Sequence, residues 1–173
     1  MRVSVVGSSG SGKTTMGKAI ASRLAIPYIE LDAIFHQPRW TELPEEEFRA
    51  RVRASTAGDA WVIDGNYSVV RPIVLERATT VVWLDYSRPR VMQQVIRRSL
   101  ARGVTRRELW NGNREHPRDW VRADHPIRWS WSHHERKRRE YEARFELPEY
   151  AHLDVRRFCV PDDARAWLDS LEA

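Results

Sequence analysis

Short apolar runs alternate along the chain with segments in which apolar residues recur every three to four positions. The apolar runs predict strands at residues 2–6, 27–31, 61–63, 79–84 and near 151–155. The recurring positions predict helices from Gly12 to just before Pro27, at 44–57, 88–101 and 129–146, and at 162–171. Strands that alternate with helices indicate a parallel sheet covered on both faces. The pattern therefore predicts a single three-layer α/β domain.

One stretch interrupts this alternation. Residues 102–128 are rich in Arg, Trp, Asn and His and have little periodicity, and a strongly basic helix follows them. Long irregular stretches in compact domains are usually functional lids. We expect Trp61 and Trp83, which lie in strands, to be core residues. Four further tryptophans are expected to anchor the lid rather than stack on a ligand base: Trp110, Trp120, Trp129 and Trp131.

Composition narrows the class of ligand. The net charge of the 173 residues is +5, and lysine occurs only at Lys13, Lys18 and Lys137, so nearly all basic charge is arginine. Guanidinium groups make bidentate contacts with phosphate, which suits a polyanionic ligand and would equally allow nucleic acid. No apolar run reaches the roughly 20 residues that a membrane helix needs, and we expect a cytoplasmic protein. The single cysteine, Cys159, is predicted to be a small buried core residue.

The first strand runs into a glycine-rich loop that matches G-x-x-x-x-G-K-[ST] without mismatch. It comprises Gly7, Ser8, Ser9, Gly10, Ser11, Gly12, Lys13 and Thr14, followed by Thr15. Glycines let backbone N–H groups curl round phosphates, and the helix that follows aims its positive end at the same anion. Lys13 is predicted to reach the β- and γ-phosphates, and the Thr14 hydroxyl to ligate Mg²⁺. This loop predicts a protein that binds ATP with Mg²⁺.

Three aspartates end predicted strands: Asp32, Asp64 and Asp85. In this type of fold an acid at the end of a neighbouring strand lies beside the phosphate loop and assists the metal. Asp64, followed by Gly65, is the first choice for that role. Asp32 is better placed to meet the acceptor, as a base or an orienting partner for its hydroxyl. Asp85 is interpreted as structural, and each of the three aspartates could instead cap a turn.

Several motifs together resemble the adenylate-kinase-related P-loop proteins, including the group of FlaR-type DNA topology modulation proteins. They are the phosphate loop, Leu31–Phe35, Trp61–Tyr67, Val82–Asp85 and Glu108–Glu115. The resemblance spans nearly the whole chain. It implies a P-loop NTPase fold of the nucleoside-monophosphate-kinase kind, with a five-stranded parallel sheet. It also implies an acceptor-binding segment near residues 33–58 and a lid near 102–135.

The resemblance implies roles for further residues. Asp64 is similar to the acid that helps hold Mg²⁺, and Arg97 and Arg98 resemble the basic residues close to adenine and the phosphates. Arg136 and Arg139 look like catalytic lid arginines that close over the phosphates, and Val160–Asp163 resembles the loop around adenine. Asn66-Tyr67-Ser68 stands where adenylate kinases have Phe-Pro-Arg, and Gln94 replaces an adenine-stacking arginine. Both departures argue against AMP as the acceptor.

These patterns favour a kinase that transfers the γ-phosphoryl group of Mg-ATP to a small acceptor, with nucleotides and nucleosides among the candidates. The alternative is a nucleotide-dependent nucleic-acid-binding regulator without kinase activity. No recognised DNA-binding module is present and the basic residues concentrate around the lid, which argues against that alternative. No membrane partner is expected, and the protein is expected to be a monomer or a homodimer. His36, just after Asp32, is a further candidate to face the acceptor.

Overall fold

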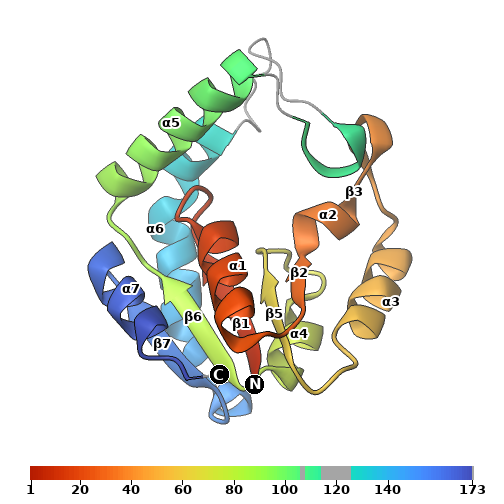
Figure 1. Ribbon diagram of the computed structural model, residues 1–173, viewed down its shortest axis with the longest axis vertical. Helices are drawn as coiled ribbons and strands as arrows, with labels where there is room; N and C mark the ends of the chain where they lie inside the picture. Colours follow the sequence, from red (N-terminus) through yellow and green to blue (C-terminus); the bar gives the residue numbers. More distant parts are fainter. Residues whose placement is uncertain (106–107, 114–125, 173) are drawn as a thin grey trace.

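The computed structural model describes residues 1–105, 108–113 and 126–172. Its centre is a five-stranded sheet in the order β2-β5-β1-β6-β7, in which every neighbouring pair is parallel (Figure 1). The strands are β1 (Arg2–Gly7), β2 (Tyr28–Glu30), β5 (Trp61–Asp64), β6 (Thr80–Leu84) and β7 (Asp154–Phe158). The predicted five-stranded parallel α/β fold is confirmed.

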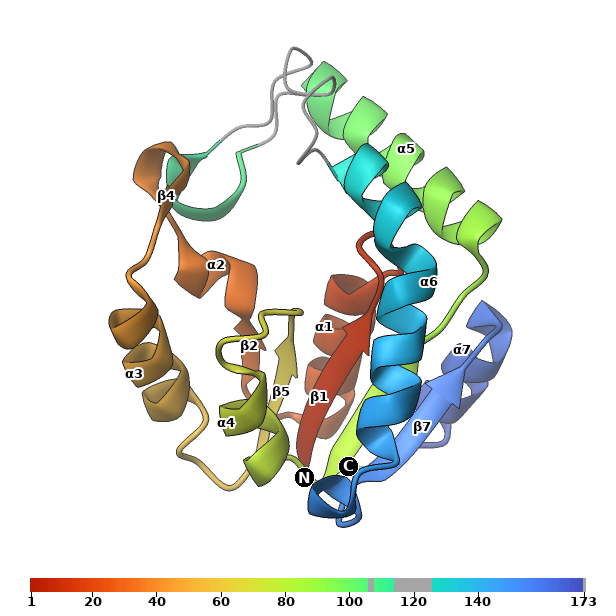
Figure 2. The same cartoon turned by 180° about the vertical axis from the view of Figure 1, so that it is seen from behind.

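Helices connect consecutive strands of the sheet and cover both faces. They are α1 (Lys13–Leu24), α2 (Leu31–Phe35), α3 (Glu45–Ser55), α4 (Arg71–Arg77), α5 (Arg88–Thr105), α6 (Pro126–Phe145) and α7 (Pro161–Asp169). Figures 1 and 2 place α1 and α7 on one face of the sheet and α4 and α6 on the other. In both views α2 and α3 lie at one end of the molecule and α5 at the other.

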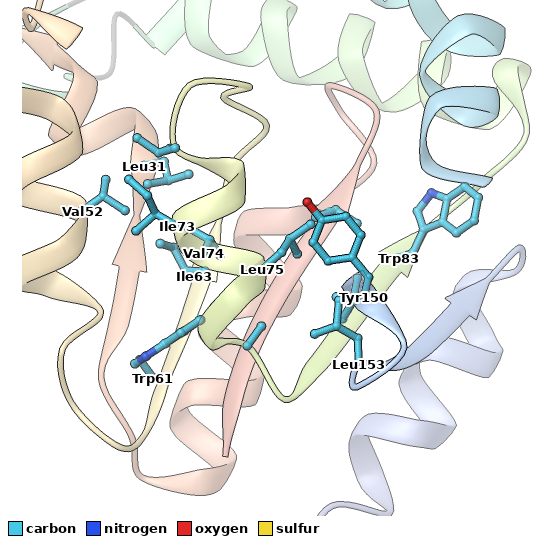
Figure 3. Close-up of a cluster of buried hydrophobic side chains, with 14 of the residues drawn as sticks. Leu31, Val52, Trp61, Ile63, Ile73, Val74, Leu75, Trp83, Tyr150 and Leu153 are labelled. Carbon is cyan, nitrogen blue, oxygen red and sulfur yellow. The ribbon is translucent and has the colours of Figure 1, made fainter. Parts of the chain in front are cut away.

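Two hydrophobic clusters, one on each face, hold these layers together. Along β6, Val81 and Trp83 belong to the cluster under α4 and α6, whereas Val82 and Leu84 belong to the one under α1 and α7. This division follows from the twofold alternation of side chains along a strand. Figure 3 shows the first cluster, in which Trp61 is almost wholly buried, at 1% exposed. The core positions predicted for Trp61 and Trp83 are confirmed.

The structure adds elements that the sequence pattern did not predict. The segment after β2 forms α2 and then an antiparallel pair, β3 (His36–Gln37) and β4 (Thr41–Glu42), joined by a 3₁₀ turn (Pro38–Trp40). Further 3₁₀ turns span Trp110–Gly112 and Pro148–Tyr150. Helix α4 lies between β5 and β6. These elements are between two and seven residues long, too short to show a period.

Two predictions near the C-terminus were wrong. The last strand covers Asp154–Phe158 and not residues 151–155, because it pairs with β6 from Thr80↔Asp154 to Leu84↔Phe158. Cys159, predicted to be buried, is exposed, since it follows the end of this edge strand. Among the described residues, no helix is long and apolar enough to cross a membrane.

Candidate active site at the phosphate loop

The loop between β1 and α1 has a backbone shape that depends on its glycines. Gly7 has φ +148°, and a Cβ there would lie 2.6 Å from the Leu84 carbonyl oxygen and 2.7 Å from Ser11 Oγ. Only glycine fits so close an approach with that backbone angle. Gly12 caps the start of α1, so the positive end of a 12-residue helix points into the loop.

The side chains of the loop are prepared for an anion. The Ser11 hydroxyl is buried and has no hydrogen-bond partner among the described residues. Lys13 donates from Nζ to the Ser8 carbonyl oxygen at 3.1 Å. Burial lowers the pKa of Lys13, an effect that nearby Asp64 and Asp32 oppose and Arg98 reinforces. An orphan donor and a desolvated cation at a helix N-terminus fit a phosphate group.

The metal side of the site joins α1 to β5. The Thr14 hydroxyl donates to Asp64 Oδ2 at 2.7 Å, so a hydroxyl and a carboxylate oxygen, ligands that Mg²⁺ accepts, stand together. Among the described residues no three His, Cys, Asp or Glu side chains cluster around a metal position. Mg²⁺ usually takes only one or two protein carboxylates and keeps its waters, so these residues fit it.

Asp64 carries an electrostatic penalty without its ligand. It is 4% exposed, and burial raises its pKa to about 6, against the Thr14 hydrogen bond and the Lys13 charge, which lower it. A carboxyl whose folded-state pKa is raised binds more protons when folded. Its contribution to the free energy of unfolding is therefore fully present below its ordinary pKa of 3.8 and is lost as pH rises to about 6.

Asp64→Asn is therefore expected to stabilise the ligand-free protein at pH 7.5, by on the order of 1–3 kcal/mol, because the amide carries no buried charge. The gain should vanish near pH 4.

In the wild type, stabilisation by Mg²⁺ with a non-hydrolysable ATP analogue should weaken as pH falls through about 6, since metal binding needs the deprotonated carboxylate. Thermal unfolding between pH 4 and 8 measures both effects.

Asp85→Asn is the matched control, because Asp85 is also a buried aspartate at the end of a strand. It should destabilise the protein at pH 7.5, since it breaks a buried ion pair. A stabilising Asp85→Asn, or an Asp64→Asn protein that keeps the full Mg²⁺ response, would contradict this assignment of roles.

Asp85 has its own partners. Its Oδ2 accepts hydrogen bonds from Arg157 Nε at 2.9 Å and Nη2 at 2.6 Å, and Arg138 Nε lies 3.2 Å away. The Arg157 guanidinium also lies 4.3 Å from the centre of a Trp83 ring. Asp85 therefore links the end of β6 to β7 through Arg157 and to α6 through Arg138. These contacts agree with the structural interpretation of this residue.

The segment that follows β5 contacts the phosphate loop through a hydrogen bond from Asn66. Gly65, with φ +137°, lies against Leu31, whose side chain would be 2.7 Å from an added Cβ. The close approach at this glycine is thus to a core side chain. Asn66 Nδ2 donates to the Gly7 carbonyl oxygen, and Tyr141 Oη donates to Asn66 Oδ1 at 2.5 Å. Helix α6 is thereby linked through Asn66 to the first residue of the loop.

On the acceptor side three polar side chains form a chain of hydrogen bonds. Tyr67 Oη donates to Asp32 Oδ1 at 2.6 Å and lies 3.3 Å from His36 Nε2. Burial and the charge of Asp32 raise the pKa of Tyr67, so the phenol stays protonated and acts as a donor. One Asp32 oxygen is thus fixed by Tyr67. Asp32 and Lys13 line the same cavity.

One cavity of about 1460 Å³ joins these groups. The cations that line it come from four helices: Lys13, Arg98, Lys137 and Arg165. Pro161, from the predicted adenine loop, also lines it, as does Gln94, whose buried Oε1 has no hydrogen-bond partner among the described residues. The cavity has room for a nucleotide beside a second small molecule.

Some predicted site residues lie elsewhere. Arg97 is exposed and does not line the cavity, unlike Arg98. Arg136 is 63% exposed and pairs with Glu140 at 3.4 Å, and Arg139 is also exposed outside the lining. Any role of these three arginines in catalysis or binding stays a prediction.

Lys137 is a lining residue that sequence reasoning missed. It lies one turn before Tyr141, which is 3% exposed and marks the buried face of α6. Residues four apart share a helix face. The spacing of four residues from the apolar Tyr141 could therefore have predicted that Lys137 faces inward, whereas Arg136 and Arg139 lie to either side of that face.

Residues 108–113, around Trp110, are hydrogen-bonded to the acceptor segment. Asn113 Nδ2 donates to the Gln37 carbonyl oxygen at 2.9 Å, and its Oδ1 accepts from the Trp40 N–H at 2.8 Å. Asn111 Nδ2 donates to the Ala33 and His36 carbonyl oxygens at 3.1 and 2.5 Å. The Trp110 ring stacks on His36 with centroids 5.8 Å apart. The Trp110 ring thus packs against the acceptor segment, and its role as an anchor of the lid stays a prediction. Trp120 and the side chain of Trp129 lie outside the described residues.

Comparisons with known proteins agree on one group. The profile of the shikimate kinase family matches residues 9–54. A shikimate kinase of Symbiobacterium thermophilum is 32% identical over 127 residues, which are 65% of this chain and 71% of that protein.

Two solved structures share the fold. The structure described as shikimate kinase from Acinetobacter baumannii in complex with shikimate has a TM-score of 0.57 at 19% identity, and covers 96% of this chain and 90% of its own. A shikimate kinase from Bacteroides thetaiotaomicron has a TM-score of 0.51 at 18% identity, with 98% and 94% covered.

Proposed function

The chain belongs to the shikimate kinase family, and on that premise we propose that it phosphorylates a hydroxyl of a small acceptor bound beside Asp32. It is an ATP-dependent phosphotransferase whose cofactors are ATP and Mg²⁺, as the phosphate loop predicted. The observation that carries the proposal is the shared cavity, onto which Lys13, the Thr14–Asp64 pair and Asp32 all open.

The donor half of this mechanism rests on the loop and its neighbours. Backbone N–H groups of residues 7–15 and the end of α1 hold the phosphates, and Lys13 neutralises charge that develops on the transferring oxygens. Thr14 and Asp64 would hold Mg²⁺, which when bound supplies a Lewis acid to the phosphate oxygens. Arg98, Lys137 and Arg165 line the same end of the cavity and add positive charge there.

The acceptor half rests on Asp32. With one oxygen fixed by Tyr67, its carboxylate can accept a hydrogen bond from the attacking hydroxyl. It can take the proton as the new P–O bond forms and the bond between the γ-phosphorus and ADP breaks. Phosphoryl transfer asks mainly for positioning and for neutralisation of charge, so a fixed orientation of Asp32 is the relevant contribution.

We place the acceptor in the segment near residues 33–58, which supplies one wall of the cavity, and the lid near 102–135. The hydrogen bonds from Asn111 and Asn113 to residues 33–40 imply that this part of the lid moves with the acceptor segment. Closure of such a unit over the cavity would exclude water that would otherwise hydrolyse ATP. Part of the lid lies outside the described residues.

Shikimate, bound in the solved relative from Acinetobacter baumannii, is the first acceptor to test, followed by nucleosides, nucleotides and sugars. Purified protein with Mg²⁺ and γ-labelled ATP is expected to transfer label to at least one of them. Transfer should stop when Mg²⁺ is chelated and resume when it is restored. If label appears only in inorganic phosphate with every acceptor, the proposed kinase function fails.

A further inference from the structure

Charge is divided unequally between the two ends of the cavity. The lining acids other than Asp64 all come from the acceptor segment: Asp32, Glu42 and Glu45. The lining cations all come from α1, α5, α6 and α7: Lys13, Arg98, Lys137 and Arg165. Figures 1 and 2 show α2 and α3 at one end of the sheet and α5 and α7 at the other, with α1, which carries Lys13, between them. The cationic end suits the triphosphate, and the other end is acidic.

The remaining lining residues at the acidic end are apolar or uncharged polar side chains. Phe35, Phe48 and Tyr67 pack on one another with ring centroids 4.6 to 5.2 Å apart and present an apolar floor. His36 Nδ1 is buried and has no hydrogen-bond partner among the described residues, which leaves one polar atom available to an acceptor. Among those residues, no arginine or lysine lines this end.

Arg49, on the acceptor segment, is paired with one of the lining acids. Arg49 follows Phe48, and its Nε and Nη2 lie 3.0 and 2.8 Å from Glu45 Oε1. An acceptor carboxylate or phosphate would compete with Glu45 for this guanidinium. Arg39 is exposed and is not part of the lining.

We propose that the acceptor is an alcohol without negative charge, either a neutral polyol or a hydroxylated amine, and that Glu42 and Glu45 disfavour carboxylates and phosphates. This inference rests on the proposed function and concerns the same site. An anionic acceptor would meet three lining carboxylates and, within the described part of this end, no lysine or arginine to pair with, whereas an ammonium group would gain from the carboxylates. The family's usual carboxylate acceptor is therefore expected to be a poor one for this chain.

The position of the two glutamates sets the size of the effect. Both are exposed at the rim, and the Glu45 side chain is 55% exposed, so water and salt screen their charge. We expect kcat/KM to differ by about tenfold between matched acceptors of different charge, and the difference to shrink at 0.5 M salt, where the Debye length is only about 4 Å.

The test compares acceptors that share a skeleton and differ in charge. The sets are glycerate, glycerol and aminopropanediol; gluconate, glucose and glucosamine; shikimate and its methyl ester; and AMP and adenosine. Transfer from γ-labelled ATP is measured for each member. In every set that reacts, the uncharged or cationic member should react about tenfold faster than the anion.

Variants of Glu42 and Glu45 then test whether these two residues cause the preference for uncharged or cationic acceptors. Glu42→Gln and Glu45→Gln should each reduce the preference by about two- to fivefold, and Glu45→Gln should help carboxylates more because it also frees Arg49. Glu46→Gln is the matched control: the same change of charge, one residue further along α3, outside the cavity lining. It should leave the preference unchanged.

The outcomes separate the inference from the proposed function. If anions react faster, or if the preference survives in Glu42→Gln and Glu45→Gln, the inference is overturned and the kinase function stands. Anion preference would point to arginines between 114 and 130, whose side chains lie outside the described residues. If no member of any set is labelled while ATP is still hydrolysed, the proposed function itself is overturned.

Discussion

Lys13→Ala is expected to reduce phosphoryl transfer by about 1,000-fold while the protein remains folded. The Lys13 ammonium is the positive group inside the phosphate loop, and removing one preorganised electrostatic contact of this kind typically costs 100- to 1,000-fold in rate. The fold should survive because the ammonium is desolvated, as its lowered pKa reflects, and because alanine favours the helix that begins at this position. Steady-state transfer and thermal unfolding give the two readouts.

Lys18→Ala provides the control on the same helix. Lys18 is 60% exposed and pairs with Glu30 at 3.8 Å, so its loss should change the free energy of unfolding by less than about 1 kcal/mol. Transfer should stay within about threefold of the wild-type rate, since surface changes away from a site rarely exceed such effects. A Lys13→Ala protein that keeps more than a tenth of wild-type activity would remove Lys13 from the mechanism.

The parts of the site that the sequence predicted are those determined locally. The phosphate loop needs only its own glycines, Lys13 and Thr14, together with the strand before it and the helix after it. The proximity of Asp64 to Thr14 also followed, because β1 and β5 are parallel neighbours whose carboxyl ends meet at one edge of the sheet.

Other parts depended on contacts between distant segments. The short elements α2, β3 and β4 have little periodicity of their own, and hydrogen bonds from Asn111 and Asn113, more than 70 residues away, help to hold them. The bounds of β7 were misjudged because its arginines look like solvent-facing loop residues. In the structure Arg157 lies in the strand and pairs with Asp85.

The division of charge in the cavity was likewise hidden. Glu45, Glu46 and Glu47 look alike in the sequence as acids in the first turn of a helix, where the helix dipole favours them. Only the packing of α3 shows that Glu45 lines the cavity while Glu47 pairs with Arg51 at the surface. The sequence therefore predicts the reaction class better than it predicts the acceptor.

Asp32→Asn is expected to lower acceptor-dependent transfer by about 100- to 10,000-fold, the range typical of a lost general base. Asparagine keeps the shape, and its Oδ1 can still accept the hydrogen bond from Tyr67, so the geometry around the residue should persist. Stabilisation by Mg²⁺ with a non-hydrolysable ATP analogue should be unchanged, because the donor half is intact. Transfer assays and thermal unfolding with the analogue separate the two halves of the site.

Tyr67→Phe distinguishes a base from a residue that only orients its neighbour. This variant keeps the Asp32 carboxylate but removes the 2.6 Å hydrogen bond that fixes it. Because the base remains and only its orientation loosens, we expect a smaller loss, about tenfold, in line with the net energy of one hydrogen bond to a charged group. If Asp32→Asn cost no more than Tyr67→Phe, proton transfer to Asp32 would contribute little. Asp32 would then act only by orienting the acceptor hydroxyl toward the γ-phosphate, which a dissociative transition state would favour.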